Sequence, residues 1–257
     1  AQGLLPDEVP SSQLGMASGL KTTLDMAGII LSSLLMGFLI SSENADPTLS
    51  VLVIIGLLVI FALITLLFSR EKSTATVERV RIDWKALWKS VFYFKAEGDK
   101  NYWRLIFSRF LYLVGIYGFQ SFAQYFIRDK FPAQDAIQFT QFVMGSFVIV
   151  LIIFSLLSGR WSNRFGQKRL QIVSSFVGAV GAVLVIFAST PVQLIAFGSI
   201  LGAGLGIFLA TNWALANQMA PQGDAGKYMG LTNLATAGSA AVARLDGPMT
   251  DVFNNAA

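Results

Sequence analysis

The sequence contains no cysteine and no histidine. Without cysteine it has no disulfide, no thiol nucleophile and no cysteine-ligated zinc or iron–sulfur site. Without histidine it has no Ser-His-Asp triad, no HExxH metal site and no imidazole base. Any proton chemistry in this sequence therefore uses Asp, Glu, Lys, Tyr or water.

Charge is also scarce. Only 13% of the 257 residues are charged, whereas soluble domains have roughly 25%. Hydrophobic residues make up 54%, and the mean hydropathy is +0.61. A soluble globule of this size needs more polar surface to cover its core. The composition therefore predicts a polytopic membrane protein.

Seven stretches are long and apolar enough to cross a bilayer, which needs about 20 residues as a helix. They lie near residues 18–40, 49–68, 104–127, 138–157, 170–188, 192–215 and 228–245. The second stretch has no charge, which argues against a buried helix of a soluble protein. We therefore expect an all-α membrane helical bundle.

Lysine and arginine lie mainly in alternate loops. If the chain starts inside, the inner loops hold 13 basic residues and the outer loops hold only Arg128 and Lys130. Cytoplasmic loops carry such an excess. We expect a multi-pass protein of a bacterial-type plasma membrane, with the start of the chain on the cytoplasmic side.

The long inner connection, 69–103, contains an amphipathic pattern. Its apolar residues recur at helical spacing, and they are Trp84, Leu87, Trp88, Val91 and Phe92. This pattern favours a helix on the inner membrane surface, held by indole rings and by anionic lipid. A helix that binds a partner is the alternative.

A short pattern, P-x4-G-x3-G, occurs near both ends of the sequence. It starts at Pro10 and again at Pro221, an offset of 211 residues, and each copy precedes an apolar stretch. Proline stops a helix and glycine allows a tight turn. The pattern indicates parts of two homologous halves of six spans each, as in many secondary transporters. Two unrelated loops are the alternative.

Residues 159–169, GRWSNRFGQKR, resemble the inter-span signature of the major facilitator superfamily, G-x-x-x-D-R-x-G-R-K/R-x. The resemblance implies a bundle of twelve spans, of which this sequence covers five to eleven. Residues 1–68 would end the first half, 69–103 would connect the halves, and 104–257 would belong to the second half. The likeness is closest to sugar-cation symporter-like branches, and the full-length protein would be a monomer.

The same resemblance implies that the 159–169 segment helps to hold one access state. Two glycines would form the turn, and basic side chains would bond the last carbonyls of a neighbouring helix. Asn163 replaces the family's Asp and Gln167 its Arg, which weakens the charge network. The gating residues are Gly159, Asn163, Arg164, Gly166, Lys168 and Arg169. Simple anchoring to the inner surface is the alternative.

Polar residues within spans are candidates for solute contact, because burying them unpaired is costly. Tyr117, Gln120 and Gln124 share one helix face, which the resemblance implies lines the central cavity. Phenol and amide groups suit hydroxyl-rich solutes. Further candidates are Gln141, Asn212 and Trp213. Bonding between helices, or interface anchoring for the tryptophan, is the alternative.

Lys21 and Asp25 lie four residues apart near the inner end of a span. A local ion pair is the simple interpretation. The alternative is that Asp25 binds H⁺ or Na⁺ and couples it to solute movement. We expect Arg109 and Arg244 to reach the membrane surface rather than to neutralise a solute carboxylate.

These features predict a secondary transporter that moves a small solute by alternating access, with a sugar or glycoside driven by a cation as the leading interpretation. A drug or metabolite efflux carrier and a non-transporting receptor or scaffold are the alternatives. An enzyme is not expected, because the spans hold almost no acid besides Asp25. We expect no cofactor, no metal and no nucleic acid, and membrane lipid as a partner.

The orientation has a direct test, because the sequence has no cysteine of its own. In a cysteine-free version of the full-length protein, we expect Ser42→Cys to react with an impermeant maleimide in intact cells. Ser73→Cys, in the basic connection, should react only after permeabilisation. The reverse pattern would contradict the positive-inside assignment.

Overall fold

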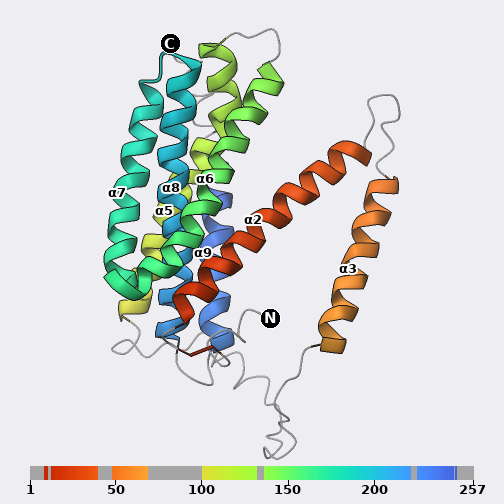
Figure 1. Ribbon diagram of the computed structural model, residues 1–257, viewed down its shortest axis with the longest axis vertical. Helices are drawn as coiled ribbons and strands as arrows, with labels where there is room; N and C mark the ends of the chain where they lie inside the picture. Colours follow the sequence, from red (N-terminus) through yellow and green to blue (C-terminus); the bar gives the residue numbers. More distant parts are fainter. Residues whose placement is uncertain are drawn as a thin grey trace, which may run out of the picture. The chain divides into compact units, whose positions relative to one another are not determined.

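The computed structural model describes residues 9–10, 13–39, 48–68, 100–131, 136–220, 225–245 and 247. Within these ranges the regular structure is helical (Figure 1). The helices are α2 (Leu14–Leu39), α3 (Thr48–Phe68), α5 (Lys100–Lys130), α6 (Ala136–Phe165), α7 (Gln167–Ile186), α8 (Pro191–Met219) and α9 (Ala225–Ala243). Each overlaps one predicted span, so the all-α expectation is confirmed.

In the described part of the chain, three helices are long and apolar enough to cross a membrane by length and composition. They are Phe142–Phe165 within α6, Gln167–Ile186 and Pro191–Met219. A shorter apolar helix, Val51–Leu67, has most of its large side chains exposed, as expected for a surface that meets lipid. The predicted amphipathic helix around Trp84 lies outside the described residues.

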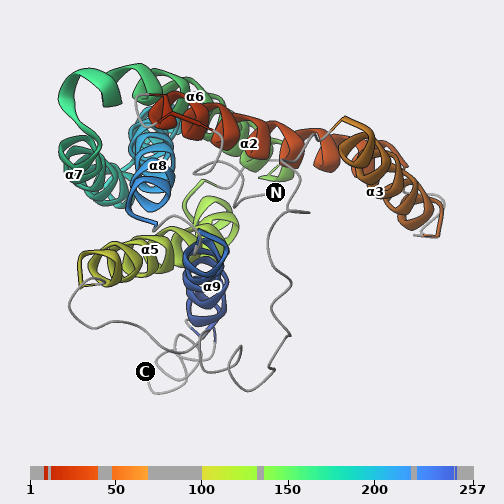
Figure 2. The same ribbon diagram turned by 90° about the horizontal axis from the view of Figure 1, so that it is seen from below.

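The chain divides into two compact units, residues Ala1–Met26 with Lys95–Ala257, and residues Ala27–Phe94. In the first unit, α8 packs against both α6 and α7, and α5 packs against α9. Figure 2 shows these two groups from below, with α8 between its neighbours.

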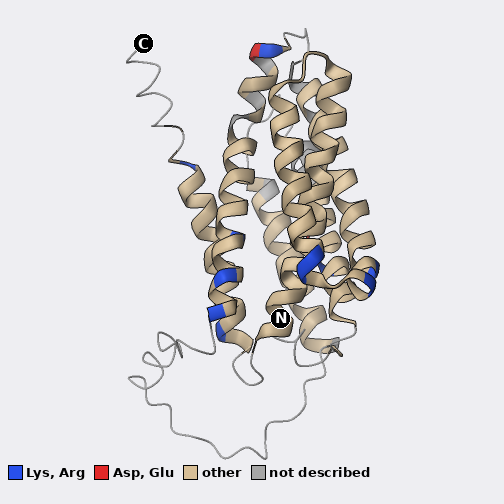
Figure 3. Ribbon diagram, turned by 90° about the vertical axis from the view of Figure 1, so that its left-hand side faces the viewer, with Lys and Arg blue, Asp and Glu red and all other residues tan. Residues whose placement is uncertain are grey.

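Charged residues are placed unevenly along the helices of this unit. Figure 3 shows most of the coloured Lys and Arg residues near one end of the bundle, and a basic and an acidic residue at the opposite end. This arrangement agrees with the predicted gathering of cations at one membrane face. Which side of the membrane that face meets stays a prediction.

Glycines let α8 approach its neighbours closely. A Cβ atom at Gly202 would lie 2.6 Å from the carbonyl oxygen of Phe147 on α6. A Cβ at Gly204 would lie 2.5 Å from the backbone nitrogen of Gly178 on α7. At Gly206 it would overlap the carbonyl oxygen of Leu151. Small residues at these positions therefore set the distance between the helices.

The turn between α6 and α7 consists of one residue, Gly166, with φ of 82°. The expectation that Gly159 also forms this turn was wrong. Gly159 lies inside α6, and a Cβ there would lie 3.1 Å from the carbonyl oxygen of Gly15 on α2. A sharp reversal needs positive φ at one position only, whereas the other glycine allows close helix packing.

The contact between α2 and α6 continues over several small residues. The Ser155 hydroxyl donates a hydrogen bond to the Gly19 carbonyl at 3.1 Å, and a Cβ at Gly15 would lie 2.6 Å from Ser162 Oγ. We call the set Gly15, Gly19, Ser155, Gly159 and Ser162 the α2–α6 seam. It brings the two backbones close together without large side chains between them.

Gly206→Ala should destabilise the full-length protein, because the added methyl group meets a backbone oxygen that moves only with α6. We expect a loss of about 1–3 kcal/mol, typical of an overpacked core. Gly198→Ala is the matched control on the same helix, since a Cβ there meets nothing within 4 Å. Thermal unfolding in detergent measures both, and equal melting temperatures would contradict this account of α8.

Candidate solute-binding site

A buried arginine joins three helices. Arg109 on α5 is only 2% exposed. Its Nη1 donates to Oδ1 of Asn212 on α8 at 2.6 Å, and its Nε donates to Oγ1 of Thr236 on α9 at 2.9 Å. The expectation that Arg109 reaches the membrane surface was therefore wrong. Two neutral acceptors on neighbouring helices hold the guanidinium inside the bundle.

An indole ring lies against the same guanidinium. Trp213 is 6% exposed, and its ring centroid lies 4.7 Å from Arg109 Cζ. Lys21 Nζ, from α2, lies 4.4 Å from the same centroid. The ring therefore lies inside the helical bundle, and whether it also anchors the protein at the membrane interface stays a prediction. Its electron-rich face stabilises both cations.

Lys21 is also paired with a carboxylate. Its Nζ lies 2.5 Å from Oδ2 of Asp25, one turn further along α2. The predicted local ion pair is thus confirmed. The Asp25 side chain is about half exposed, at 49%, so the carboxylate is not buried inside the bundle. A coupling role for Asp25 stays a prediction.

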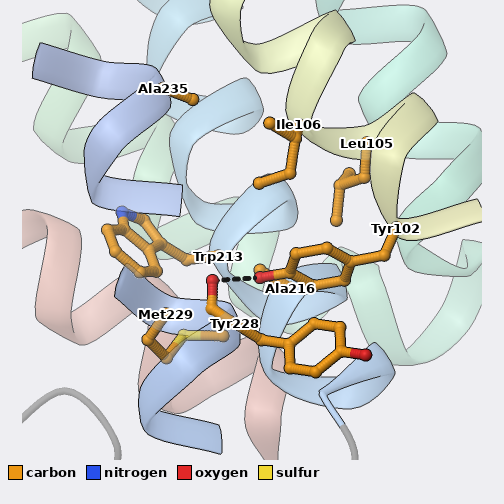
Figure 4. Packing of buried hydrophobic residues seen from close by; sticks show 8 residues of the cluster. All are labelled: Tyr102, Leu105, Ile106, Trp213, Ala216, Tyr228, Met229 and Ala235. Atoms are coloured by element: carbon orange, nitrogen blue, oxygen red, sulfur yellow. Dashed lines mark hydrogen bonds between the residues drawn. The ribbon is translucent and has the colours of Figure 1, made fainter. Parts of the chain in front are cut away.

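A second polar contact joins α5 to α9 near the same end of α5 (Figure 4). Tyr102 Oη donates to the Tyr228 carbonyl at 2.6 Å and lies 2.8 Å from Thr232 Oγ1. The two tyrosine rings meet edge to face, with centroids 4.7 Å apart. Since Tyr102 and Arg109 are two turns apart, these contacts together fix α5 against α9.

Two buried amides have unused hydrogen-bonding capacity. Asn212 is fully buried and Asn217 is 2% exposed. Among the described residues, Asn212 Nδ2 and both polar side-chain atoms of Asn217 have no hydrogen-bond partner. An unsatisfied buried polar atom costs about 1–3 kcal/mol. These groups therefore provide donors and an acceptor that a bound molecule can use.

We call Arg109, Asn212, Trp213 and Thr236 the Arg109 cluster. Sequence reasoning selected Asn212 and Trp213 and misjudged Arg109. It missed Thr236 and Tyr102 as site-forming residues. One sequence feature could have identified them. Arg109 lies two turns after Tyr102, and Thr236 one turn after Thr232, so each pair shares one face of its helix.

The other predicted solute contacts are less buried than Asn212 and Trp213, or their side chains are not described. Tyr117 is half-buried and packs beside Leu113 and Leu151, whereas Gln120 is exposed. The side chains of Gln124 and Gln141 lie outside the described residues. A solute role for these four residues stays a prediction.

The predicted gating residues lie around the α6–α7 turn. Asn163, Arg164, Lys168 and Arg169 are exposed. The Arg164 guanidinium carbon lies 5.5 Å from the Phe165 ring centroid. Gly166 forms the turn, as described above. The role of this segment in holding an access state stays a prediction.

A separate cavity of about 230 Å³ lies between α5 and α7. Its lining residues are Gly118, Phe119, Ala123, Phe126, Val185 and Ile186. It starts nine residues beyond Arg109 on α5 and is almost wholly apolar.

In the described part of the chain, no group of three or more acidic side chains could hold a metal ion.

The fold and the cluster define a class, a multi-pass helical membrane protein with polar groups buried among its spans. Comparison of the sequence with protein-family models is more specific. The model described as Major Facilitator Superfamily matches residues 1–243. The chain therefore belongs to this superfamily, whose members are transporters and not enzymes.

The individual relatives that match have low sequence identity to this chain. The multi-drug resistance efflux pump PmrA of Streptococcus pneumoniae is 22% identical over 222 residues, which are 86% of this chain and 54% of the pump. This chain thus spans about half the length of that relative. An uncharacterized MFS-type transporter of Mycobacterium tuberculosis is 29% identical over 92 residues, 36% of this chain and 13% of that protein.

The α5–α9 contact allows a double-mutant test. Tyr102→Phe and Thr232→Val each remove one hydroxyl of the pair that lies 2.8 Å apart. We expect a coupling free energy of about 0.6 kcal/mol, as for hydrogen bonds in other membrane bundles. Thermal unfolding of the two single variants and the double variant measures it. Additive effects would show that the two hydroxyls do not interact, and Thr232→Ser, which keeps the hydroxyl, serves as the control.

Proposed function

We propose that the whole protein exports an organic solute by alternating access, and that the solute contacts the Arg109 cluster. The observation that carries this proposal is the buried guanidinium of Arg109, which bonds Asn212 and lies against Trp213. Intramembrane charge is expensive and marks solute or ion pathways in membrane proteins. The membership of the chain in a transporter superfamily supports the same interpretation.

Efflux is better supported than sugar symport. The relative PmrA is named a multi-drug resistance efflux pump. The chemistry of the cluster agrees with this choice, because it combines an aromatic ring and a cation rather than the paired amides expected for a sugar. Of those amides on α5, Gln120 is exposed. We therefore propose that the solute has an apolar or aromatic part beside its polar group.

The α2–α6 seam is the proposed moving contact. By the predicted numbering, α2 belongs to the first half of the transporter and α6 to the second. Contacts between small residues separate without moving large side chains. Alternating access requires the two halves to rock about the solute site. We propose that this seam closes one side of the pathway and opens during transport.

Asp25 is the proposed coupling group. Its carboxylate pairs with Lys21, and the Lys21 ammonium in turn lies against Trp213 of the Arg109 cluster. Protonation of Asp25 would release Lys21 and change the charge next to the cluster. A proton gradient would in this way drive solute movement. Binding of Na⁺ at Asp25 is the alternative.

Flux measurements on the full-length protein test the proposal. In proteoliposomes energised by a proton gradient, we expect uptake of at least one dye from a panel of ethidium, 8-anilinonaphthalene-1-sulfonate and N-phenyl-1-naphthylamine. Asp25→Asn should lower gradient-driven uptake at least tenfold while dye exchange at equilibrium continues. A sodium gradient in place of the proton gradient distinguishes the two coupling ions.

Two outcomes would contradict the proposal. Binding of a dye without flux under either gradient would favour a receptor on the same fold. Uptake of sugars in preference to every dye would favour the symport interpretation. Ser158→Ala removes a hydroxyl that, among the described residues, donates to the Ser155 carbonyl one turn before it, and it is a control with expected normal flux.

A further inference from the structure

The geometry points to a specific chemistry for the solute. We propose that Arg109 and Asn212 form a subsite for an anionic group, a carboxylate or a sulfonate, carried by the solute. This inference rests on the proposed transport function, and it adds the class of ligand that the Arg109 cluster binds.

The first argument is the uncompensated charge of Arg109. Both hydrogen bonds that its guanidinium makes to residues the structure describes go to neutral oxygen atoms, those of Asn212 and Thr236. Across the described ranges, the ion pair in the structure is that of Lys21 with Asp25, which leaves Arg109 without a carboxylate. A buried charge without a counter-charge is strongly unfavourable. An anion at this position would remove that penalty.

The second argument is the number of donors that remain. A guanidinium has five N–H groups in a planar fork, and the two bonds use one on Nε and one on Nη1. The amide of Asn212 is oriented by Arg109, because its oxygen has to face the donor. Its Nδ2, which has no partner among the residues described, therefore keeps two further donors beside the guanidinium. A planar carboxylate, or two oxygen atoms of a tetrahedral sulfonate, suits such an array.

The third argument concerns the other cation near the same ring. Lys21 and Arg109 both lie within 4.7 Å of the Trp213 centroid, so positive charge is concentrated around one indole. Lys21 is matched by Asp25, whereas Arg109 has no acidic partner among the residues that the structure describes. This concentration of positive charge favours an anionic group beside Arg109.

Two fluorescent probes that differ by one sulfonate provide the test. 8-Anilinonaphthalene-1-sulfonate is anionic, and N-phenyl-1-naphthylamine is the same ring system without the sulfonate. We would titrate both against the purified full-length protein in a neutral detergent. The measured quantity is the ratio of their affinities, which cancels nonspecific binding to apolar surface.

Arg109→Gln removes the charge and keeps an amide donor, and it should lower the ratio of anion to neutral-probe affinity at least tenfold. Arg104→Gln is the matched control, because Arg104 is an exposed arginine on the same helix. It should leave the ratio unchanged. Asn212→Asp places a carboxylate next to Arg109, and it should also lower the ratio at least tenfold while raising the melting temperature.

The Asn212→Asp variant keeps the inference testable if Arg109→Gln does not fold, because it creates an ion pair rather than removing one. An unchanged ratio in either folded variant would overturn the inference. It would indicate that a carboxylate elsewhere in the full protein neutralises Arg109. Because the ratio is measured by binding, a changed ratio in the variants together with no dye flux by the unaltered protein would overturn the proposed export alone.

Discussion

The arrangement of α5, α8 and α9 depends on how the guanidinium of Arg109 is accommodated. A charge among apolar helices is tolerated only if polar groups from neighbouring elements reach it. Asn212 and Thr236 do so from two different helices, and Trp213 covers the same group with its ring. The cluster is therefore both a structural junction and the place where a bound anion would gain most.

That junction requires α8 to lie close to α6 and α7. Gly202, Gly204 and Gly206 have neighbouring backbone atoms where a side chain would stand, so they bring α8 within reach of both helices. The resulting position leaves Asn212 and Trp213, on the last turns of α8, inside the bundle. The close packing of α8 at its glycines thus determines that the polar groups of Asn212 and Trp213 lie inside the bundle.

The α2–α6 seam uses the same kind of residue for a different purpose. Here Ser155 and Gly159 on α6 lie directly against the backbone of Gly15 and Gly19 on α2. The sequence pattern drew attention to these glycines as loop-forming residues, but among the glycines that the structure describes only Gly166 has positive φ and forms a turn. A glycine in a sequence marks either a bend or a close approach, and the local sequence alone does not distinguish the two.

Apolar length and periodicity by themselves determined the all-α class and the approximate bounds of the helices, because each span has to satisfy its backbone hydrogen bonds internally. The Lys21–Asp25 pair was also predictable, since residues four apart on a helix are neighbours. The burial of Arg109 and the selection of Thr236 and Tyr102 were decided only by the tertiary structure. Their partners lie more than 100 residues away in the sequence, and no local pattern specifies which helices meet.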